Sequence, residues 1–213
     1  MYVPAHFAEQ RPEEIHRLLR EHPLGTLVTQ GPAGLDATHL PFEFDPAAGA
    51  HGLLQAHVAR ANPLWQQQRD GDAVLVVFHG ANAYVSPNWY PSKHELHRQV
   101  PTWNYQVVHA HGTLRIRDDE KFVRGVVARL TRANEARAAE PRPWKIGDSE
   151  PAYIDKLVGA IVGIEVEVTR LVAVSKLNQN KEARDRDAVA ATLAARGRGD
   201  VADAMDRAAP PAA

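Results

Sequence analysis

Polar side chains interrupt an apolar strand at Ala37–Pro41 (ATHLP), and this is the first place in the chain where chemistry could sit. Thr38 and His39 stand side by side there. Because buried polar groups find hydrogen-bond partners, one of the two side chains must meet a polar group, in a ligand or in the protein itself. Adjacent residues of a strand point to opposite faces, so both side chains can line one groove only if the strand is bulged.

The second stretch, His57–Pro63, runs from a strand end into the start of a short helix. Unpaired backbone N–H groups and the positive end of a helix dipole make such a junction receptive to an anion. Arg60 would add a bidentate contact to a phosphate. An ordinary strand–helix turn with a solvated arginine is the alternative, and the residues by themselves leave both interpretations open.

Two large aromatic residues mark the third stretch, Val100–Tyr105. Trp103 and Tyr105 are two positions apart, so on a strand they share a face, and Asn104 points to the other face. A pair of this kind can cover a planar ring or fill a protein interface. Packing in the core is the alternative.

Amides and a cation are concentrated after the last predicted strand, at Ser175–Lys181 (SKLNQNK). One interpretation is a polar exit loop in which an asparagine caps the next helix. The other is a clamp that faces a ligand, with Lys176 placed against an anion.

Other kinds of chemistry lack their motifs. The chain has no cysteine, which excludes disulfide scaffolds, thiolate metal sites and cysteine nucleophiles. His109 and His111 share one face of a strand, a spacing that some zinc sites use. A third ligand would have to come from His39 or His57, however, and no carboxylate is near in the sequence. Since GxSxG, Ser-x-x-Lys, GxGxxG and Walker motifs are also missing, we predict no metal site, and the motifs name no catalytic residue.

The elements that position these residues are mostly strands. Apolar and β-branched runs, separated by Gly, Pro and Asp clusters, predict a three-stranded meander, followed by a hairpin that turns at His79-Gly80. A long strand and a half-exposed strand with alternating apolar and polar residues complete the set. The predicted strands are Leu24–Thr29, Leu35–Phe42 and Leu53–Val58 in the meander, Ala73–Phe78 and Ala81–Ser86 in the hairpin, and then Pro101–Arg117 and Ile164–Val172.

Helices are expected outside these strands. About seven strands in mostly antiparallel order predict a mainly β fold with flanking helices (α+β), and a small barrel is the economical arrangement. The predicted helices are Pro12–His22, Asn62–Arg69, Asp118–Arg137, Pro151–Leu157 and an Ala- and Arg-rich segment from Lys181 that frays at Pro210-Pro211, with an irregular loop over Pro87–Gln99.

Composition narrows the class of protein. Of the 213 residues, 44% are hydrophobic and 24% are charged, which is typical of a globular protein and excludes a disordered or fibrous chain. The 25 Lys and Arg residues against 26 Asp and Glu residues argue against direct DNA binding. The longest apolar stretch, Leu157 to Ile164, is far shorter than the ~20 residues of a membrane helix. Because the first residues also lack a signal-peptide pattern, we expect a soluble, cytoplasmic protein with no membrane partner.

A set of motifs in a fixed order carries a resemblance to a known family. Met1-Tyr2-Val3-Pro4 is followed by GTLVT, ATHLPF, HVARANP, AYVSPNWY, VPTWNY and KLNQNK. Over residues 1–190 the chain resembles the PaiB-like FMN-binding negative transcriptional regulator family. That family is similar to the pyridoxamine-phosphate-oxidase-like split barrels, which are homodimers holding flavins at the subunit interface. The resemblance implies an antiparallel split β-barrel of the FMN-binding type over residues 1–178, with inserted helices, and a C-terminal helical extension and flexible tail over residues 179–213.

The resemblance also implies FMN as the cofactor and a place for it. The flavin would run along Ala37–Pro41, and Arg60 with backbone N–H groups of His57–Asn62 would hold its phosphate. Trp103 and Tyr105 of the partner subunit would supply the second wall of the ring slot. The cofactor-binding residues predicted in this way are Thr38, His39, Leu40, His57, Ala59, Arg60, Asn62, Trp103, Asn104, Tyr105, Lys176 and Gln179.

Three functions are compatible with such a protein. The resemblance implies a flavoprotein with a regulatory or sensing role through its bound flavin. The alternative is a flavin-dependent oxidoreductase acting on a small molecule, and the second alternative is a haem-binding split-barrel protein. In an oxidoreductase, His39 would be placed to tune the flavin, because a histidine of near-neutral pKa can donate to a reduced, anionic ring.

Overall fold

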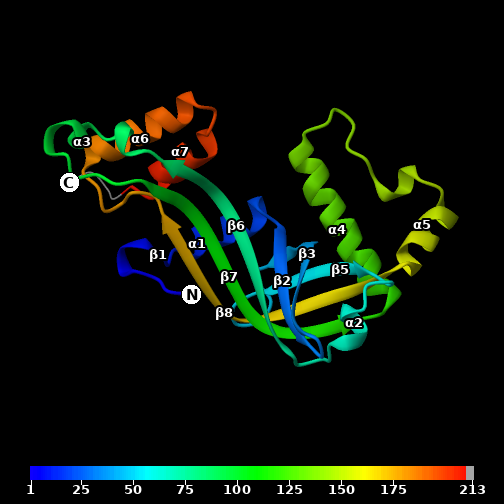
Figure 1. Cartoon of the computed structure of the whole chain (residues 1–213). Coiled ribbons are helices and arrows are strands. Elements are labelled where there is room, and N and C mark those ends of the chain that lie inside the picture. The colour runs from blue at the N-terminus through cyan, green and yellow to red at the C-terminus, as the bar shows by residue number, and fades with distance from the viewer. Residues whose placement is uncertain (210–213) are drawn as a thin grey trace. The chain divides into compact units, whose positions relative to one another are not determined.

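The computed structural model describes residues 1–209, so the predicted frayed end at Pro210-Pro211 lies outside the described residues. The chain forms two compact units (Figure 1). Unit 1 comprises residues 1–15, 79–108 and 172 onward, and unit 2 comprises residues 16–78 and 109–171. Three long strands, β6 (Ala73–Val85), β7 (Thr102–Arg117) and β8 (Ile161–Lys176), contribute residues to both units. The domain boundary predicted at residue 178 stays a prediction.

The strands of the described chain form one eight-stranded sheet in the order β3-β2-β6-β7-β8-β5-β4, with β1 paired to β8. The ladders whose register is resolved are antiparallel. In unit 2, Cα atoms of β3 come within 8 Å of β5, but no ladder between described residues joins these two strands. The barrel is therefore split, and the predicted fold class of a mainly antiparallel split barrel with flanking helices is confirmed. The shorter strands are β1 (Ala8–Glu9), β2 (Leu24–Gly31), β3 (Gly34–Pro41), β4 (Glu43–Asp45) and β5 (Leu53–Ala59).

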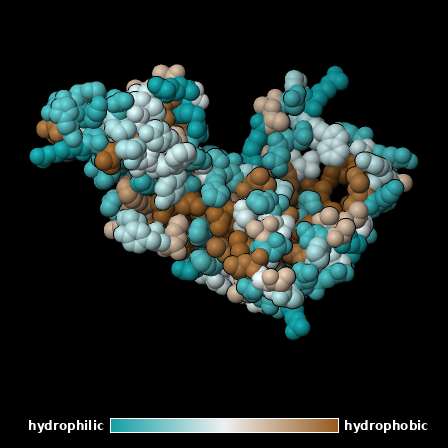
Figure 2. Space-filling view, in the orientation of Figure 1, coloured by the Kyte–Doolittle hydropathy of each residue, from teal (hydrophilic) through white to brown (hydrophobic). Residues whose placement is uncertain are grey.

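Alternating side chains build the core of unit 2. Along β2, Gly25, Leu27 and Thr29 are buried and their neighbours are not, which is the period-two pattern of a strand with one face in a core. The same alternation runs through β5 and the first half of β6. Figure 2 shows hydrophobic side chains, in brown, gathered over the strands in the middle of the view. The buried side chains of this core include Leu27, Leu40, Phe42, Phe44, Leu54, Val76, Phe78, Leu114 and Ile164.

A long helix, α4 (Glu120–Ala138), packs on β4 and β5. The Asp119 side chain caps its first turn by accepting a hydrogen bond from the Phe122 N–H at 2.8 Å. The Phe122 ring lies where a Cβ of residue 163 would be, and such a Cβ would also stand 2.8 Å from the carbonyl oxygen of Arg117. Gly163 is therefore what lets α4 approach β8.

The helices of unit 1 enclose a core of their own. Tyr90, Leu177, Leu193 and Met205 are each no more than 1% exposed in it. The remaining helices of the described chain are α1 (Pro12–Glu21), α2 (Leu64–Gln67), α3 (Pro91–Leu96), α5 (Pro151–Gly159), α6 (Ala183–Ala195) and α7 (Gly199–Arg207), with single turns at Ala5–Phe7, Pro87–Trp89 and Ile146–Asp148.

The predicted hairpin at His79-Gly80 is wrong, because β6 runs without a turn from Ala73 to Val85. Its buried positions are Val76 and Phe78 before this point, and Ala81 and Ala83 after it. The buried face thus changes from even to odd positions where the strand passes from unit 2 into unit 1. In the sequence, this break in the alternation beside a glycine has the same pattern as a turn.

Three other expectations are corrected. The third strand of the predicted meander, β5, pairs with β4 and β8 instead of β3. The stretch predicted as the irregular loop Pro87–Gln99 contains a helical turn and α3. The strand predicted as half-exposed over Ile164–Val172 is longer and mostly buried. Even Glu165 is only 6% exposed, and its carboxylate accepts a hydrogen bond from the Gln55 amide.

Candidate functional site

Side chains on one face of β2, β3 and β6 form a strip that the core does not use. Thr26 is directly opposite His39 on one side and Val77 on the other, and opposite residues of an antiparallel pair point the same way. The residues next to them in sequence, Leu27 and Val76, are fully buried, so the Thr26 row faces outward. We call this half-exposed to exposed surface the outer strip: Thr26, Val28, Ala37, His39, Leu75 and Val77.

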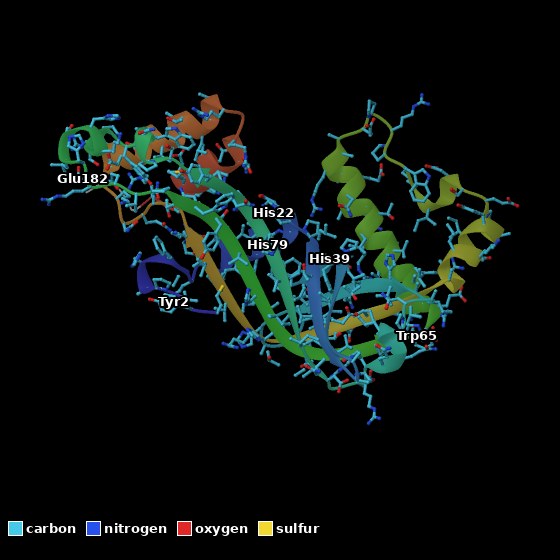
Figure 3. The ribbon with its side chains drawn as sticks, in the orientation of Figure 1. Tyr2, His22, His39, Trp65, His79 and Glu182 are labelled. Atoms are coloured by element: carbon cyan, nitrogen blue, oxygen red, sulfur yellow. The ribbon has the colours of Figure 1, made fainter. Side chains whose placement is uncertain are left out.

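The strand register separates the predicted residues of β3. His39 lies on the outer strip, and Figure 3 shows it on β3 beside β2. Thr38 is opposite the buried Leu27, and Leu40, which is 7% exposed, is opposite Gly25. Thr38 and Leu40 therefore face the inside of the split barrel, and of the two polar residues only His39 is available on the outer face.

β7 lies next to β6 in the sheet and adds polar residues to the same region of unit 2. His109, His111 and Thr113 are half-exposed and alternate with the buried Ala110 and Leu114. The Nε2 atom of His111 is buried and has no hydrogen-bond partner among the described residues. Burial and, to a smaller extent, the charge of Arg170 lower the pKa of His111 below its usual value, so its imidazole is neutral at pH 7.

Arg60, the predicted phosphate ligand, is engaged by the protein. Its guanidinium donates to both carboxylate oxygens of Asp118, at 2.9 and 2.5 Å. It also donates to the carbonyl oxygens of Gly159 and Ile161, at 2.9 and 3.2 Å, and lies 5.6 Å from the centre of the Trp65 ring. A phosphate role for Arg60 stays a prediction, and it would require this arrangement to open.

The other predicted residues of that stretch have local roles in the structure. His57 alternates with the buried Ala56 and Val58, so it points away from the barrel interior, and its Nδ1 is buried without a partner among residues 1–209. Burial lowers the pKa of His57. Asn62 accepts a hydrogen bond from the Leu64 N–H at 2.9 Å and so starts α2, while Ala59 ends β5 at an exposed position.

In unit 1, Trp103 and Tyr84 form an exposed aromatic pair. Their ring centres are 6.2 Å apart in an edge-to-face arrangement, and the side chains are 50% and 47% exposed. The Trp103 indole N–H donates to Asn82 at 3.3 Å. Tyr105 is on the same face of β7 as Trp103, as predicted, whereas Asn104 is fully buried and its Nδ2 contacts the Met205 sulfur at 3.5 Å. Tyr84 is not among the predicted site residues, since the stretch Ala81–Ser86 was expected to return in a hairpin at His79-Gly80.

The predicted clamp after β8 binds groups of the protein. The Lys176 ammonium donates to the Thr102 hydroxyl at 2.8 Å. Gln179 accepts from the Leu177 N–H at 2.7 Å and donates to the Ser175 carbonyl oxygen, which closes the turn between β8 and α6. These contacts match the alternative of a polar exit loop, and a ligand contact by Lys176 or Gln179 stays a prediction.

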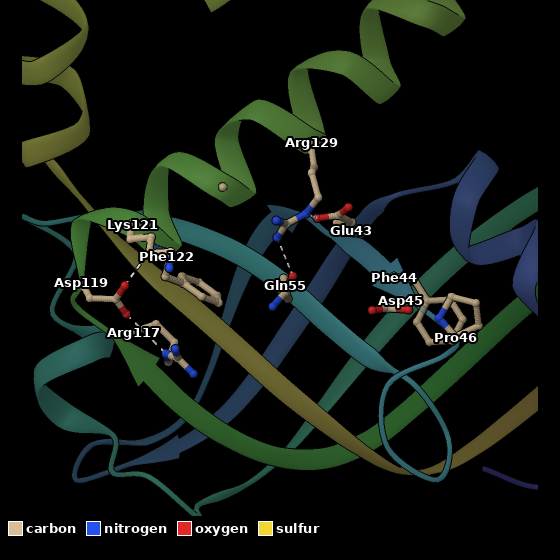
Figure 4. A pocket seen from close by; sticks show the side chains of 11 residues that line it. Glu43, Phe44, Asp45, Pro46, Gln55, Arg117, Asp119, Lys121, Phe122 and Arg129 are labelled. Carbon is tan, nitrogen blue, oxygen red and sulfur yellow. Dashed lines mark hydrogen bonds and ion pairs between the residues drawn. The ribbon is translucent and has the colours of Figure 1, made fainter.

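A cleft of about 620 Å³ lies between α4 and the β4–β5 hairpin (Figure 4). A chain of polar side chains crosses it: Arg129 donates to Glu43 at 2.5 Å and to Gln55 at 2.7 Å. Gln55 in turn donates to Glu165, and Arg117 stands 3.5 Å from a Glu165 oxygen. Because carboxylates neutralise both guanidiniums, the cleft has no strong preference for an anion.

Comparisons with known proteins agree with this fold. Residues 1–170 match the model of a family described as "Putative FMN-binding domain". The chain is 32% identical over 185 residues to the "Protease synthase and sporulation protein PAI 2" of Bacillus subtilis, covering 87% of this chain and 85% of that protein. It is 35% identical over 162 residues to the protein YKL070W of Saccharomyces cerevisiae, covering 66% of this chain and 94% of that protein.

A solved structure shares the fold at low sequence identity. The "FAD and Heme binding protein" of Mycobacterium smegmatis superposes with a TM-score of 0.55 at 16% identity, over 79% of this chain and 73% of that protein. Within residues 1–209, the structure has no helix of the length and apolar character that a membrane span requires.

Proposed function

Because the chain belongs to the FMN-binding domain family, we propose that it is a split-barrel flavoprotein with a regulatory or sensing role exerted through bound FMN. The observation that carries the proposal is the outer strip of unit 2, a half-exposed to exposed surface that the core leaves open. FMN supplies hydride and electron transfer when it is bound, and the protein supplies its binding, orientation and electrostatics.

The outer strip suits one face of a flavin ring. Val28, Leu75 and Val77 offer apolar contact to a planar ring, and Thr26 and His39 offer hydrogen-bonding groups at the same level of the sheet. Ligand sites commonly combine an apolar lining with a few polar groups that fix orientation. The residues present therefore fit the cofactor, and His39 is the residue that we propose beside the ring.

A homodimer would complete this site. A strip on an open sheet gives the ring one wall, and Trp103 of the partner subunit, with Tyr84, would supply the other. Exposed aromatic pairs of this kind are typical of interfaces, because they bury large apolar area when a partner covers them. The interface position of the flavin and the cytoplasmic location stay predictions.

Regulation without direct DNA binding fits the C-terminal helices. α6 and α7 are joined by the short turn 196–198, which resembles a helix-turn-helix in length. The exposed face of α7 carries Asp203 and Asp206, however, and Asp200 neutralises Arg198 in the turn before it, so this face offers little attraction to a phosphate backbone. The Bacillus subtilis relative is named for protease synthesis and sporulation. We propose that a regulatory role of this chain would be exerted without direct binding to DNA.

The two alternative functions, an oxidoreductase and a haem-binding protein, would use the same outer face of unit 2. An oxidoreductase acting on a small molecule would use the flavin with His39 as the tuning group. A haem-binding protein would use His39, His109 or His111 as the iron ligand, since imidazole is a common haem ligand. The Mycobacterium smegmatis neighbour is described as binding both FAD and haem, but at 16% identity it supports only the fold.

Titration of the purified protein with FMN tests the proposal. Quenching of flavin fluorescence and a shifted flavin absorbance band are expected for the wild type and for Val28→Thr, which keeps the shape of the strip. Val28→Glu places a charge under the ring and should abolish both signals, whereas Ala47→Glu, at an exposed turn of unit 2, should change neither. Thermal melts verify that each variant is folded. A wild type that binds haem with a Soret band but no FMN would replace the proposal with the haem alternative.

A further inference from the structure

We propose that a pocket of unit 2, between α4 and the connector 139–150, binds a small aromatic carboxylate. The expected ligand is a flat system of one or two rings that carries a single carboxylate. The pocket shares no residue with the outer strip, so the inference goes beyond the proposed function and does not depend on bound FMN.

The pocket has a volume of about 520 Å³, within the range of roughly 300–1,000 Å³ that is typical of small-molecule sites. The chain turns back after the end of α4 and runs toward α5, so the connector lies along the second half of the helix (Figure 1). The apolar side chains of the lining are Ala128, Ala136, Pro143, Trp144 and Ile146.

The helix contributes a face that the core does not use. Val126 and Leu130 are buried on the side of α4 that packs on β4 and β5. At 3.6 residues per turn, Ala128 lies about 200° around the helix from each of them. Thr131 and Glu135 follow Ala128 at i+3 and i+7, so they share its face and line the same pocket. The pocket is therefore a space between this face and the connector, and not a packing defect in the core of unit 2.

Trp144 offers a flat surface to a ligand. Its indole is 41% exposed although it lines the pocket, and the helix side chains Ala128 and Ala136 are too small to fill the space. The Trp144 backbone N–H donates to the Glu135 carboxylate at 2.9 Å, which ties the connector to α4 at this residue. Aromatic rings gain contact energy by stacking on one another with an offset or edge to face. A flat ring therefore suits this pocket better than a flexible chain.

The charges of the lining favour an anion. Arg132 and Lys145 line the pocket and are exposed, and within residues 1–209 neither side chain forms a salt bridge. The carboxylate of the lining, Glu135, already accepts the Trp144 N–H. Arginine can donate two parallel hydrogen bonds to a carboxylate. Long cationic side chains also cover apolar surface with their stems and keep the charged end in water. An apolar ring with one carboxylate at its edge satisfies both parts of this lining.

Isothermal titration calorimetry with 2-naphthoate and the uncharged 2-naphthamide separates the contribution of the charge from that of the ring. The wild type should bind 2-naphthoate about 3- to 10-fold more tightly than 2-naphthamide, as expected for a charge-assisted contact that is partly exposed. Arg132→Gln should remove this preference and leave the affinity for 2-naphthamide within about 2-fold. Arg69→Gln is the matched control, an exposed arginine of unit 2 outside the pocket, and should keep the preference.

Two further variants test the shape of the pocket. Ala136→Leu places a larger side chain in it at an exposed helix position, where leucine is nearly as good a helix former as alanine. It should abolish binding of both probes and leave the thermal melt unchanged. Trp144→Leu keeps an apolar side chain but removes the ring, and should weaken both probes about 2- to 10-fold. Octanoate, which has a carboxylate but no ring, should bind the wild type more weakly than 2-naphthoate.

Each part of the proposal has an outcome that would overturn it. The pocket assignment is wrong if the wild type binds neither probe at millimolar concentration, or if Ala136→Leu binds as the wild type does. Equal affinities for the acid and the amide would overturn the preference for an anion, and equal affinities for octanoate and 2-naphthoate would overturn the aromatic ligand. Saturating FMN should leave 2-naphthoate binding unchanged, and competition would place the probe at the flavin site instead. If no probe binds and Trp144→Leu lowers the mass measured by light scattering, a second copy of this chain occupies the pocket instead of a small ligand.

Discussion

Arg60 and Asp118 face each other in a bidentate ion pair, with nitrogen–oxygen distances of 2.9 and 2.5 Å, that connects the end of β5 to the end of β7. The same guanidinium reaches the carbonyl oxygens of Gly159 and Ile161, where α5 gives way to β8. Three chain segments of unit 2 therefore meet on one arginine side chain.

This pair makes a pH-dependent contribution to stability. The Arg60 hydrogen bonds lower the pKa of the Asp118 carboxyl below its usual value. A carboxyl whose pKa is lower in the folded state stabilises the protein above its unfolded pKa, and that contribution is lost as the pH falls through the folded pKa. Thermal melts of Asp118→Asn and the wild type should thus differ at pH 6 and converge at about pH 2 to 3. Because the pair is exposed, the difference should be small. Parallel pH curves would contradict the assignment.

His57 is a base, whereas Asp118 is an acid, but its pKa is lowered in the folded protein as well. Burial lowers its pKa from the ordinary 6.5, so the folded protein favours the neutral imidazole. Between the two pKa values the unfolded chain binds more protons, and stability falls as the pH drops below 6.5. We expect His57→Gln to flatten this part of the stability curve between pH 7 and 5. His51→Gln, at an exposed position of unit 2, is the control and should leave the curve unchanged.

Gly163 should not tolerate a methyl group. A Cβ there overlaps the Phe122 ring and meets the Arg117 backbone, so α4 or β8 must move. Gly163→Ala is expected to lower the free energy of unfolding by about 1–3 kcal/mol in urea titrations, as overpacked sites do. Gly125→Ala is the matched control inside α4. Its Cβ would lie 3.1 Å from the end of the Arg129 side chain, which needs to shift by only a few tenths of an ångström, and alanine favours a helix over glycine by about 1 kcal/mol. Equal effects of the two substitutions would be inconsistent with this packing.

The aromatic pair of unit 1 predicts how the chain associates. If Trp103 lies in a subunit interface, light scattering should give twice the chain mass for the wild type and a concentration-dependent fall toward one chain for Trp103→Ser. Trp144→Ser removes an indole of similar exposure, 41%, from the connector after α4, and should stay dimeric. If the wild type has the mass of a single chain at micromolar concentration, the proposed interface is wrong, and so is the second wall of the flavin site.

Much of this protein could be predicted from local patterns in its sequence. Apolar and β-branched runs between turn residues identified β2, β3 and β5, and the acidic first turn of α4, with its apolar stripe, identified the longest helix. These patterns are local because a side chain's direction depends on the backbone periodicity of its own element. The ordered motifs from GTLVT to KLNQNK likewise indicated the FMN-binding family, since they depend on residue identity alone.

The arrangement of the site, in contrast, depended on pairing between distant strands. Thr38 and His39 are indistinguishable in the sequence, and the register of β3 on β2 is what puts His39 outside and Thr38 inside. The sequence suggested that Arg60 was free, but the structure brings Asp118, fifty-eight positions later, against it. That β6 continues through His79-Gly80 could not be predicted from the sequence either. A strand whose buried face changes between two cores has the same local residue pattern as a turn. Register, partner choice and the side on which a core lies are properties of contacts between segments, and only the tertiary structure decides them.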